Sequence, residues 1–203
     1  MKTYIYIIAS AAIMFAAAVQ MDAQVGKRYY INGGWQFNAT VDNPVAESAN
    51  GWGAYIEGGY YLTPRFAIGG FASVNTNNEY VPKKTYFWND GSALTTDMDY
   101  SVYQIPFGAT MRYRFTRTKL QPYIEAKLGA EYSKEYAYMS TFGSSSDNWG
   151  FYVSPEAGIT WHPFNRTNFG FQAAVYYSYA TNRNTAFNMN GINNVGFKLG
   201  ICF

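Results

Sequence analysis

Strict alternation of apolar and polar residues is the feature that most constrains the fold of this chain. It is clearest in the last nine residues, Val195 to Phe203, where a bulky apolar side chain occupies every second position. The positions between them hold glycine, lysine or cysteine. Because successive side chains of a β-strand point to opposite faces, this pattern predicts a strand with one apolar face. Such a strand calls for a partner on each edge and an apolar medium beyond one face.

The same alternation recurs along the chain and divides it into about eight segments. Long and short connections alternate between the segments, as in outer-membrane barrels with long loops outside and short turns in the periplasm. We expect strands over residues 29–39, 52–62, 66–75, 100–115, 121–132, 150–161, 168–179 and 195–203, with irregular loops at 41–51, 76–99, 133–149 and 180–191. The predicted fold class is therefore all-β: a transmembrane up-and-down antiparallel β-barrel of about eight strands.

Composition agrees with a membrane barrel and argues against several other classes. Charged residues make up 14% of the 203 residues, below the roughly 25% of an average soluble domain, while tyrosine (20) and glycine (19) are frequent. A mean hydropathy of −0.23 does not indicate a helical membrane protein. The net charge of +2 is too small to argue for a nucleic-acid partner. A single cysteine, Cys202, excludes an internal disulfide or a cysteine-based metal cluster.

The N-terminus has the features of a secretory signal peptide. Lys2 supplies a positive charge, and residues 4–19 form an uncharged apolar run followed by a short polar segment. The run is shorter than the ~20 residues that a spanning helix needs, and the polar chain after it argues against an uncleaved anchor. We therefore expect a signal peptide over residues 1–24, cleaved between residues 18 and 24, and an outer-membrane barrel domain over residues 25–203.

The polar face of the strands decides between a membrane barrel and a soluble ligand-binding barrel of the lipocalin kind, which turns its apolar face inward. Small uncharged residues dominate this face, whereas a solvated surface would be richer in lysine and glutamate. On the apolar face, aromatic residues gather near the strand ends, as in the girdles of membrane barrels. The polar face is therefore predicted to line the lumen. It carries four acidic and four basic residues: Glu57, Glu125, Glu131, Glu156, Arg112, Arg114, Lys127 and Lys198.

These eight charged residues are the main candidate constellation of the sequence. We interpret them as a structural network of ion pairs, because an eight-stranded barrel is only just wide enough for its own side chains. A polar conduit or a gate is the alternative. The single histidine, His162, precedes Pro163 in a predicted turn and has no serine and acid nearby in sequence to form a catalytic set. No catalytic, cofactor-binding or metal-binding residue is predicted, and the protein is not expected to be an enzyme.

From about Tyr29 to Phe203 the chain resembles the small eight-stranded outer-membrane barrels of the OmpA transmembrane-domain, OmpX and OmpW type. The resemblance rests on the strand pattern and on the final aromatic residue, and the Met-Asp-Ala-Gln segment before the barrel resembles exported porin-family proteins of Bacteroidota. It implies the outer membrane of a Gram-negative bacterium, contact with lipid and lipopolysaccharide, a monomeric state, no nucleic-acid partner and recognition of Phe203 by the barrel-assembly machinery.

The resemblance also implies a non-enzymatic role, structural or in surface interaction, through extracellular loops. Two alternatives stay open at this point. One is a narrow channel for small or hydrophobic solutes, as in OmpW-like proteins. The other is a soluble, lipocalin-like ligand-binding barrel, which would be recovered from the periplasm without detergent.

Deletion of Phe203 tests its role as an assembly signal. The deletion should lower the amount of barrel in the outer membrane, because the assembly machinery would lose its recognition residue, and should change the stability of barrel that has already folded much less. Immunoblots of outer membranes and unfolding of the purified protein in detergent measure the two effects separately. Normal outer-membrane levels of the deletion variant would contradict the predicted role.

Overall fold

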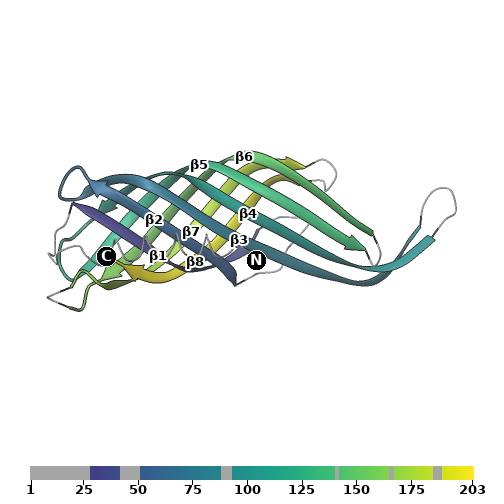
Figure 1. Ribbon diagram of the computed structural model, residues 1–203, viewed down its shortest axis with the longest axis horizontal. Coiled ribbons are helices and arrows are strands. Elements are labelled where there is room, and N and C mark those ends of the chain that lie inside the picture. The colour runs from purple at the N-terminus through teal and green to yellow at the C-terminus, as the bar shows by residue number, and fades with distance from the viewer. Residues whose placement is uncertain (1–27, 42–50, 88–92, 140–141, 165–166, 185–188) are drawn as a thin grey trace, which may run out of the picture.

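Eight antiparallel strands form a closed barrel in the computed structural model, which describes residues 28–41, 51–87, 93–139, 142–164, 167–184 and 189–203. Each strand pairs with its neighbours in sequence, and the pairing of the first with the last closes the sheet (Figure 1). The strands are β1 (Tyr29–Thr40), β2 (Trp52–Tyr61), β3 (Phe66–Phe87), β4 (Ala93–Arg114), β5 (Leu120–Met139), β6 (Phe142–Trp161), β7 (Gly170–Asn184) and β8 (Met189–Cys202). The predicted fold class is confirmed, whereas the predicted signal peptide, residues 1–24, lies outside the described residues.

The seam between β1 and β8 closes the barrel. Its ladder runs from Asn32 opposite Cys202 to Thr40 opposite Asn194. Phe203 continues the ladder, because its backbone N–H donates to the carbonyl oxygen of Ile31 at 2.9 Å. Since β8 also pairs with β7 along its length, no edge of the sheet is left open. In the described part of the chain, no helix is long and apolar enough to cross a membrane.

The alternation of residues decides which side chains face the lumen. Along β5, Tyr123, Glu125 and Lys127 are buried, whereas Ile124 and Leu128 between and beside them are 50% and 41% exposed. Large apolar side chains are exposed in the same way on every strand of the barrel wall, including Trp35, Ile56, Ile68, Phe107, Ile159, Val175 and Leu199. An apolar surface of this extent needs lipid around it. The predicted orientation of the two faces is confirmed, and it is the opposite of a lipocalin.

The hairpins at one end of the barrel are longer than the sequence analysis predicted. Residues 76–99 were expected to be irregular, but β3 and β4 pair as far as Phe87 opposite Ala93. Residues 133–149 were expected to be a second irregular loop, but β5 and β6 pair as far as Met139 opposite Phe142. The last two strands likewise extend into the expected loop 180–191. The loop predictions for these segments were wrong.

Cross-strand pairs explain why these polar segments form strands. The hydroxyls of Thr85 and Thr95 lie 2.8 Å apart on opposite strands, and the Tyr80 hydroxyl donates to Asp97 at 3.2 Å. Such pairs stabilise antiparallel strands. Pro82 falls in the register shift between Val81 and Lys84, where a missing N–H does not interrupt the ladder. As a result, the β3–β4 hairpin projects far beyond the barrel wall (Figure 1).

Glycines on the inner face make room for tyrosine rings in the narrow lumen. A Cβ on Gly158 would lie 2.6 Å from the hydroxyl of Tyr123 and 2.7 Å from the Cβ of Ala174. Gly196 is placed in the same way beneath Tyr176, where the distance would again be 2.6 Å. Both tyrosines are buried, so their rings depend on the absence of a side chain on the adjacent strand.

A pair of glycine-to-alanine substitutions tests this packing. Gly158→Ala should destabilise the barrel by about 1–3 kcal/mol, because the added methyl group overpacks the site occupied by Tyr123. Gly70→Ala is the matched control, since Gly70 is exposed on β3 and a Cβ there would come no closer than 3.4 Å to its nearest neighbour. Urea unfolding of each purified variant in lipid vesicles gives the comparison. Equal unfolding midpoints for the two variants would show that Tyr123 does not need the space.

Candidate functional site

A cluster of charged side chains fills the lumen on the side of the short turns. Six of the eight charged residues predicted to face inward meet here, and each is no more than 4% exposed. They come from five strands: Glu57 from β2, Arg112 from β4, Glu125 and Lys127 from β5, Glu156 from β6 and Lys198 from β8. The inward positions of an eight-stranded barrel are close enough for side chains from distant strands to touch.

Arg112 joins two of the glutamates. Its guanidinium donates to Glu57 Oε1 at 2.5 Å and also to Glu125 Oε2. The same guanidinium lies between the rings of Tyr30 and Tyr123, 4.0 Å from each ring centroid. Ion pairs and two aromatic faces therefore hold a charge that is removed from water.

Lys127 lies at the centre of the cluster. Its ammonium nitrogen is 2.6 Å from Glu57 Oε2, 2.6 Å from Glu156 Oε2 and 3.3 Å from Glu125 Oε1. Lys198 completes the network, with its ammonium 2.9 Å from Glu156 Oε2. Three basic side chains thus face three carboxylates, and the formal charges cancel within the cluster.

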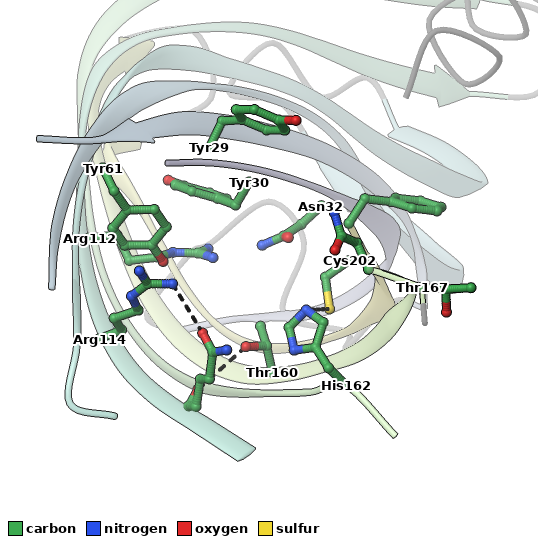
Figure 2. Close-up of a pocket in the computed structure, with 13 residues that line it drawn as sticks. Tyr29, Tyr30, Asn32, Tyr61, Arg112, Arg114, Thr160, His162, Thr167 and Cys202 are labelled. Carbon is green, nitrogen blue, oxygen red and sulfur yellow. Dashed lines mark hydrogen bonds between the residues drawn. The ribbon is translucent and has the colours of Figure 1, made fainter. Parts of the chain in front are cut away.

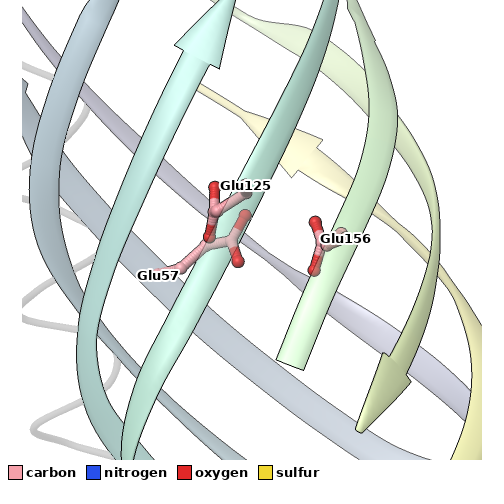
Figure 3. A group of neighbouring side chains, drawn as sticks. All are labelled: Glu57, Glu125 and Glu156. Atoms are coloured by element: carbon pink, nitrogen blue, oxygen red, sulfur yellow. The ribbon is translucent and has the colours of Figure 1, made fainter. Parts of the chain in front are cut away.

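The three carboxylates resemble a metal site in their spacing alone. One oxygen from each of Glu57, Glu125 and Glu156 lies within 4.8 Å of the others (Figure 3). Oxygen ligands at this spacing suit a hard divalent cation. The ammonium of Lys127, however, already contacts all three carboxylates, so a metal ion could bind only after displacing it. The cluster is thus closed by the protein's own cation.

Neutral residues that the sequence analysis did not single out complete the network. The side-chain amide of Gln172 donates to Glu57 Oε1 at 2.9 Å and to the hydroxyl of Tyr123 at 2.5 Å. The Tyr123 hydroxyl in turn donates to Glu156 at 2.8 Å, and the Tyr55 hydroxyl donates to Gln172 at 3.0 Å. The sequence did contain a sign of these tyrosines. They occupy the polar face of their strands, which is otherwise made mostly of small residues, so their rings must lie inside the barrel.

A buried apolar cluster covers the charge network on the side of the long hairpins. Phe71 and Tyr152 have ring centroids 5.6 Å apart, and the Lys127 ammonium lies 5.6 Å from the Phe71 ring. Val102, Ala180 and Ile192 pack in the same cluster and are at most 1% exposed. The sequence analysis missed this cluster, because Phe71 and Val102 interrupt the polar face and Ile192 falls close to a predicted loop.

The remaining two of the eight predicted residues lie apart from the network. Arg114 is near the short turns, where its guanidinium donates to the carbonyl oxygen of Pro64 at 2.8 Å and lies 3.7 Å from the centroid of the Tyr61 ring. Glu131 is fully buried in the outer half of the lumen. In the described part of the chain, its side chain makes neither an ion pair nor a hydrogen bond.

A cavity of about 50 Å³ opens at the short-turn end of the barrel, lined among others by Arg114, His162 and Cys202 (Figure 2). His162 Nε2 lies 3.6 Å from the Cys202 sulfur. Partial burial, together with the nearby Arg114, lowers the pKa of His162, so the ring is neutral at pH 7. None of the described side chains that line this cavity carries a carboxylate.

Phe203 lies at the same end of the barrel. Its ring packs edge-on against Phe169 with the centroids 5.8 Å apart. Its recognition by the assembly machinery stays a prediction.

Comparison with known proteins identifies the family. Residues 7–202 match the family model described as outer membrane protein beta-barrel domain. The chain belongs to this family. The protein is therefore an outer-membrane β-barrel of a Gram-negative bacterium, as the sequence predicted, while its Bacteroidota-like origin stays a prediction. A search of curated proteins gave no match.

Solved outer-membrane barrels resemble the structure at low sequence identity. Neisserial surface protein A is 16% identical with a TM-score of 0.51, and the match covers 87% of this chain and 96% of that one. Ail, the attachment invasion locus protein of Yersinia pestis, is 14% identical with a TM-score of 0.45 over 87% of this chain and 99% of that one. OprG from Pseudomonas aeruginosa is 14% identical with a TM-score of 0.43, and the match covers 89% of this chain and 99% of OprG. At these identities the likeness concerns the fold alone.

Substitutions at Lys127 test whether charge balance stabilises the barrel. Lys127→Met should destabilise it by about 3–5 kcal/mol, because Glu57 and Glu156 would remain buried with too little positive charge. The double variant Lys127→Met/Glu156→Gln restores the balance and should recover part of this loss. Lys134→Met is the control, because Lys134 faces outward on the same strand. Equal unfolding midpoints in denaturant for the Lys127 and Lys134 variants would contradict the role of the network.

Proposed function

We propose that the protein is a non-enzymatic outer-membrane barrel that binds other molecules at the cell surface through its β3–β4 hairpin. The observation that supports this most directly is the outer arm, defined here as residues 80–87 of β3 and 93–99 of β4. The arm begins where Tyr80 lies opposite Asp99. Pairing of β3 with β2 ends earlier, at Thr76, and pairing of β4 with β5 begins at Asp99. The arm is therefore a two-stranded extension held by its own ladder.

The outer arm carries exposed aromatic and basic side chains. Tyr80 and Phe87 are 63% and 79% exposed, and Lys83 and Lys84 are exposed as well. Exposed aromatic residues are enriched among those that dominate binding energy at protein interfaces. A paired hairpin also holds them in place before binding, which reduces the entropy lost on association. Because the short turns of outer-membrane barrels lie in the periplasm, we place the arm on the extracellular side.

The filled lumen supports a scaffold rather than a channel. The charge network and the apolar cluster of Phe71, Val102, Tyr152, Ala180 and Ile192 occupy successive levels of the barrel. Conduction would require both to separate, which would expose paired charges inside a narrow apolar wall.

Planar-bilayer recordings test the lumen. The purified wild-type protein should show no discrete channel openings, because its side chains fill the cross-section. A general porin inserted under the same conditions controls for the detection of conductance. Reproducible single-channel steps from the wild-type protein would support the narrow-channel alternative instead.

Truncation of the arm tests surface binding. Replacing residues 81–98 by Asn-Gly joins Tyr80 to Asp99 through a two-residue hairpin turn and keeps the β4–β5 ladder, so the barrel should still fold. Cells of a non-adherent strain that display the intact protein should be retained on plates coated with matrix protein, mucin or lipopolysaccharide, and truncation should remove that retention. Surface labelling and the heat-dependent gel shift confirm equal display and folding. Equal retention of the two strains on all three coatings would contradict the proposed role of the arm.

A further inference from the structure

Glu131, in the outer half of the lumen, is a buried acid whose side chain has no partner among the described residues. It is 0% exposed, and neither of its carboxylate oxygens has a hydrogen-bond partner in the described part of the chain. A lone buried carboxylate is strongly unfavourable unless a positive charge or a proton compensates it. Three other inward-facing glutamates, Glu57, Glu125 and Glu156, each contact a basic side chain.

Among the described residues, no basic side chain pairs with Glu131. Lys127 and Lys198 contact the glutamates of the charge network, and Arg112 does the same. Lys134 is near Glu131 in sequence, but it lies on the outward face of β5 above the ring of Tyr136. Since no basic side chain of the described residues pairs with Glu131, either a proton or a cation from outside must compensate this carboxylate.

Asn182 places an amide oxygen over Gly150, the residue that lies opposite Glu131. On β6, Gly150 lies opposite Glu131, and a Cβ on Gly150 would overlap Asn182 Oδ1. The missing side chain thus allows Asn182, from β7, to reach across β6. Its Nδ2 donates to Ser133 Oγ at 2.8 Å and to the carbonyl oxygens of Glu131 and Asn148, both at 3.3 Å. These three acceptors fix the orientation of the amide and leave its buried Oδ1 without a partner.

A second carboxylate extends the same oxygen-rich surface. Glu135 follows Glu131 on the inward face of β5 and is 0% exposed. It accepts hydrogen bonds from Ser133 Oγ at 2.8 Å and from Asn148 Nδ2 at 3.4 Å. Glu135 thus adds a second buried carboxylate to this half of the lumen, which makes a compensating cation or proton at Glu131 more favourable.

We propose that this part of the lumen binds a calcium ion, with the Glu131 carboxylate as the principal ligand and Asn182 Oδ1 and Glu135 as further ligands. Carboxylate and amide oxygens are the ligands that calcium prefers, and calcium tolerates irregular coordination better than magnesium does. The set contains no thiolate or imidazole, so it does not favour zinc or copper. The bound ion connects β5 with β7 across Gly150. This proposal does not depend on the proposed surface role of the arm.

The site is tested with the barrel domain refolded in zwitterionic detergent free of lipopolysaccharide, so that calcium cannot act through lipid phosphates. Calcium chloride should raise the temperature of thermal unfolding, followed by circular dichroism, and isothermal titration calorimetry should show saturable binding. Magnesium chloride at the same concentration should give a smaller shift. Addition of EDTA should reverse the effect of calcium.

The decisive variant is Glu131→Gln, which keeps the shape of the side chain and removes its charge. It should lose the calcium-dependent shift and, in EDTA, unfold at a temperature equal to or above that of the wild type, because a buried unpaired charge is gone. Asp147→Asn is the matched control: Asp147 is an exposed carboxylate on β6, opposite Lys134, and its removal should leave calcium binding intact. Asn182→Ala should weaken binding without destroying it.

Two results would overturn the proposal. One is the absence of any calcium-dependent shift in the wild type, which would mean that Glu131 is simply protonated. The other is an equal calcium response in the wild type and in Glu131→Gln, which would place the ion elsewhere on the barrel.

Discussion

Backbone pairing between β1 and β8 is the interaction on which the rest of the structure depends. In a bilayer no water is available to satisfy an open strand edge, so every N–H and C=O in the wall must find a partner strand. Closure with eight strands supplies these partners, but it leaves a lumen only just wide enough for side chains. The contents of the barrel follow from that width: glycine lies beneath the rings of Tyr123 and Tyr176, and charged groups must touch.

The charge network shows how a narrow lumen can hold six ionised groups. Each carboxylate contacts a cation, and Lys127 lies among three of them. Desolvation of ions is costly, so this arrangement depends on the additional hydrogen bonds from Gln172 and Tyr123. The ring of Tyr123 in turn depends on Gly158. The glycine in the wall, the tyrosine ring and the charge network therefore depend on one another at the same level of the barrel.

Much of this could be predicted from the sequence, because period-2 alternation fixes the face of every residue in a strand. It placed all eight charged residues inside and the apolar belt outside. It could not predict which charges meet, since Glu57 and Lys127 are joined only by the stagger of strands around the closed sheet. It also failed at the hairpin ends, where residues such as Thr85 and Thr95 resemble loop residues in composition but form cross-strand pairs. The polar composition of these segments favoured loops, because composition alone does not show whether a segment pairs with a neighbouring strand.

The two halves of the lumen are different in charge, and this difference has a physical consequence. In the inner half the protein supplies its own cations, so the cluster is complete without a ligand. In the outer half, the side chain of Glu131 on β5 has neither an ion-pair nor a hydrogen-bond partner among the described residues. The same rule that requires pairing in the inner half therefore requires an external cation or a proton in the outer half. The end of the barrel nearest the outer arm is thus the part whose stability responds to the ions of its surroundings.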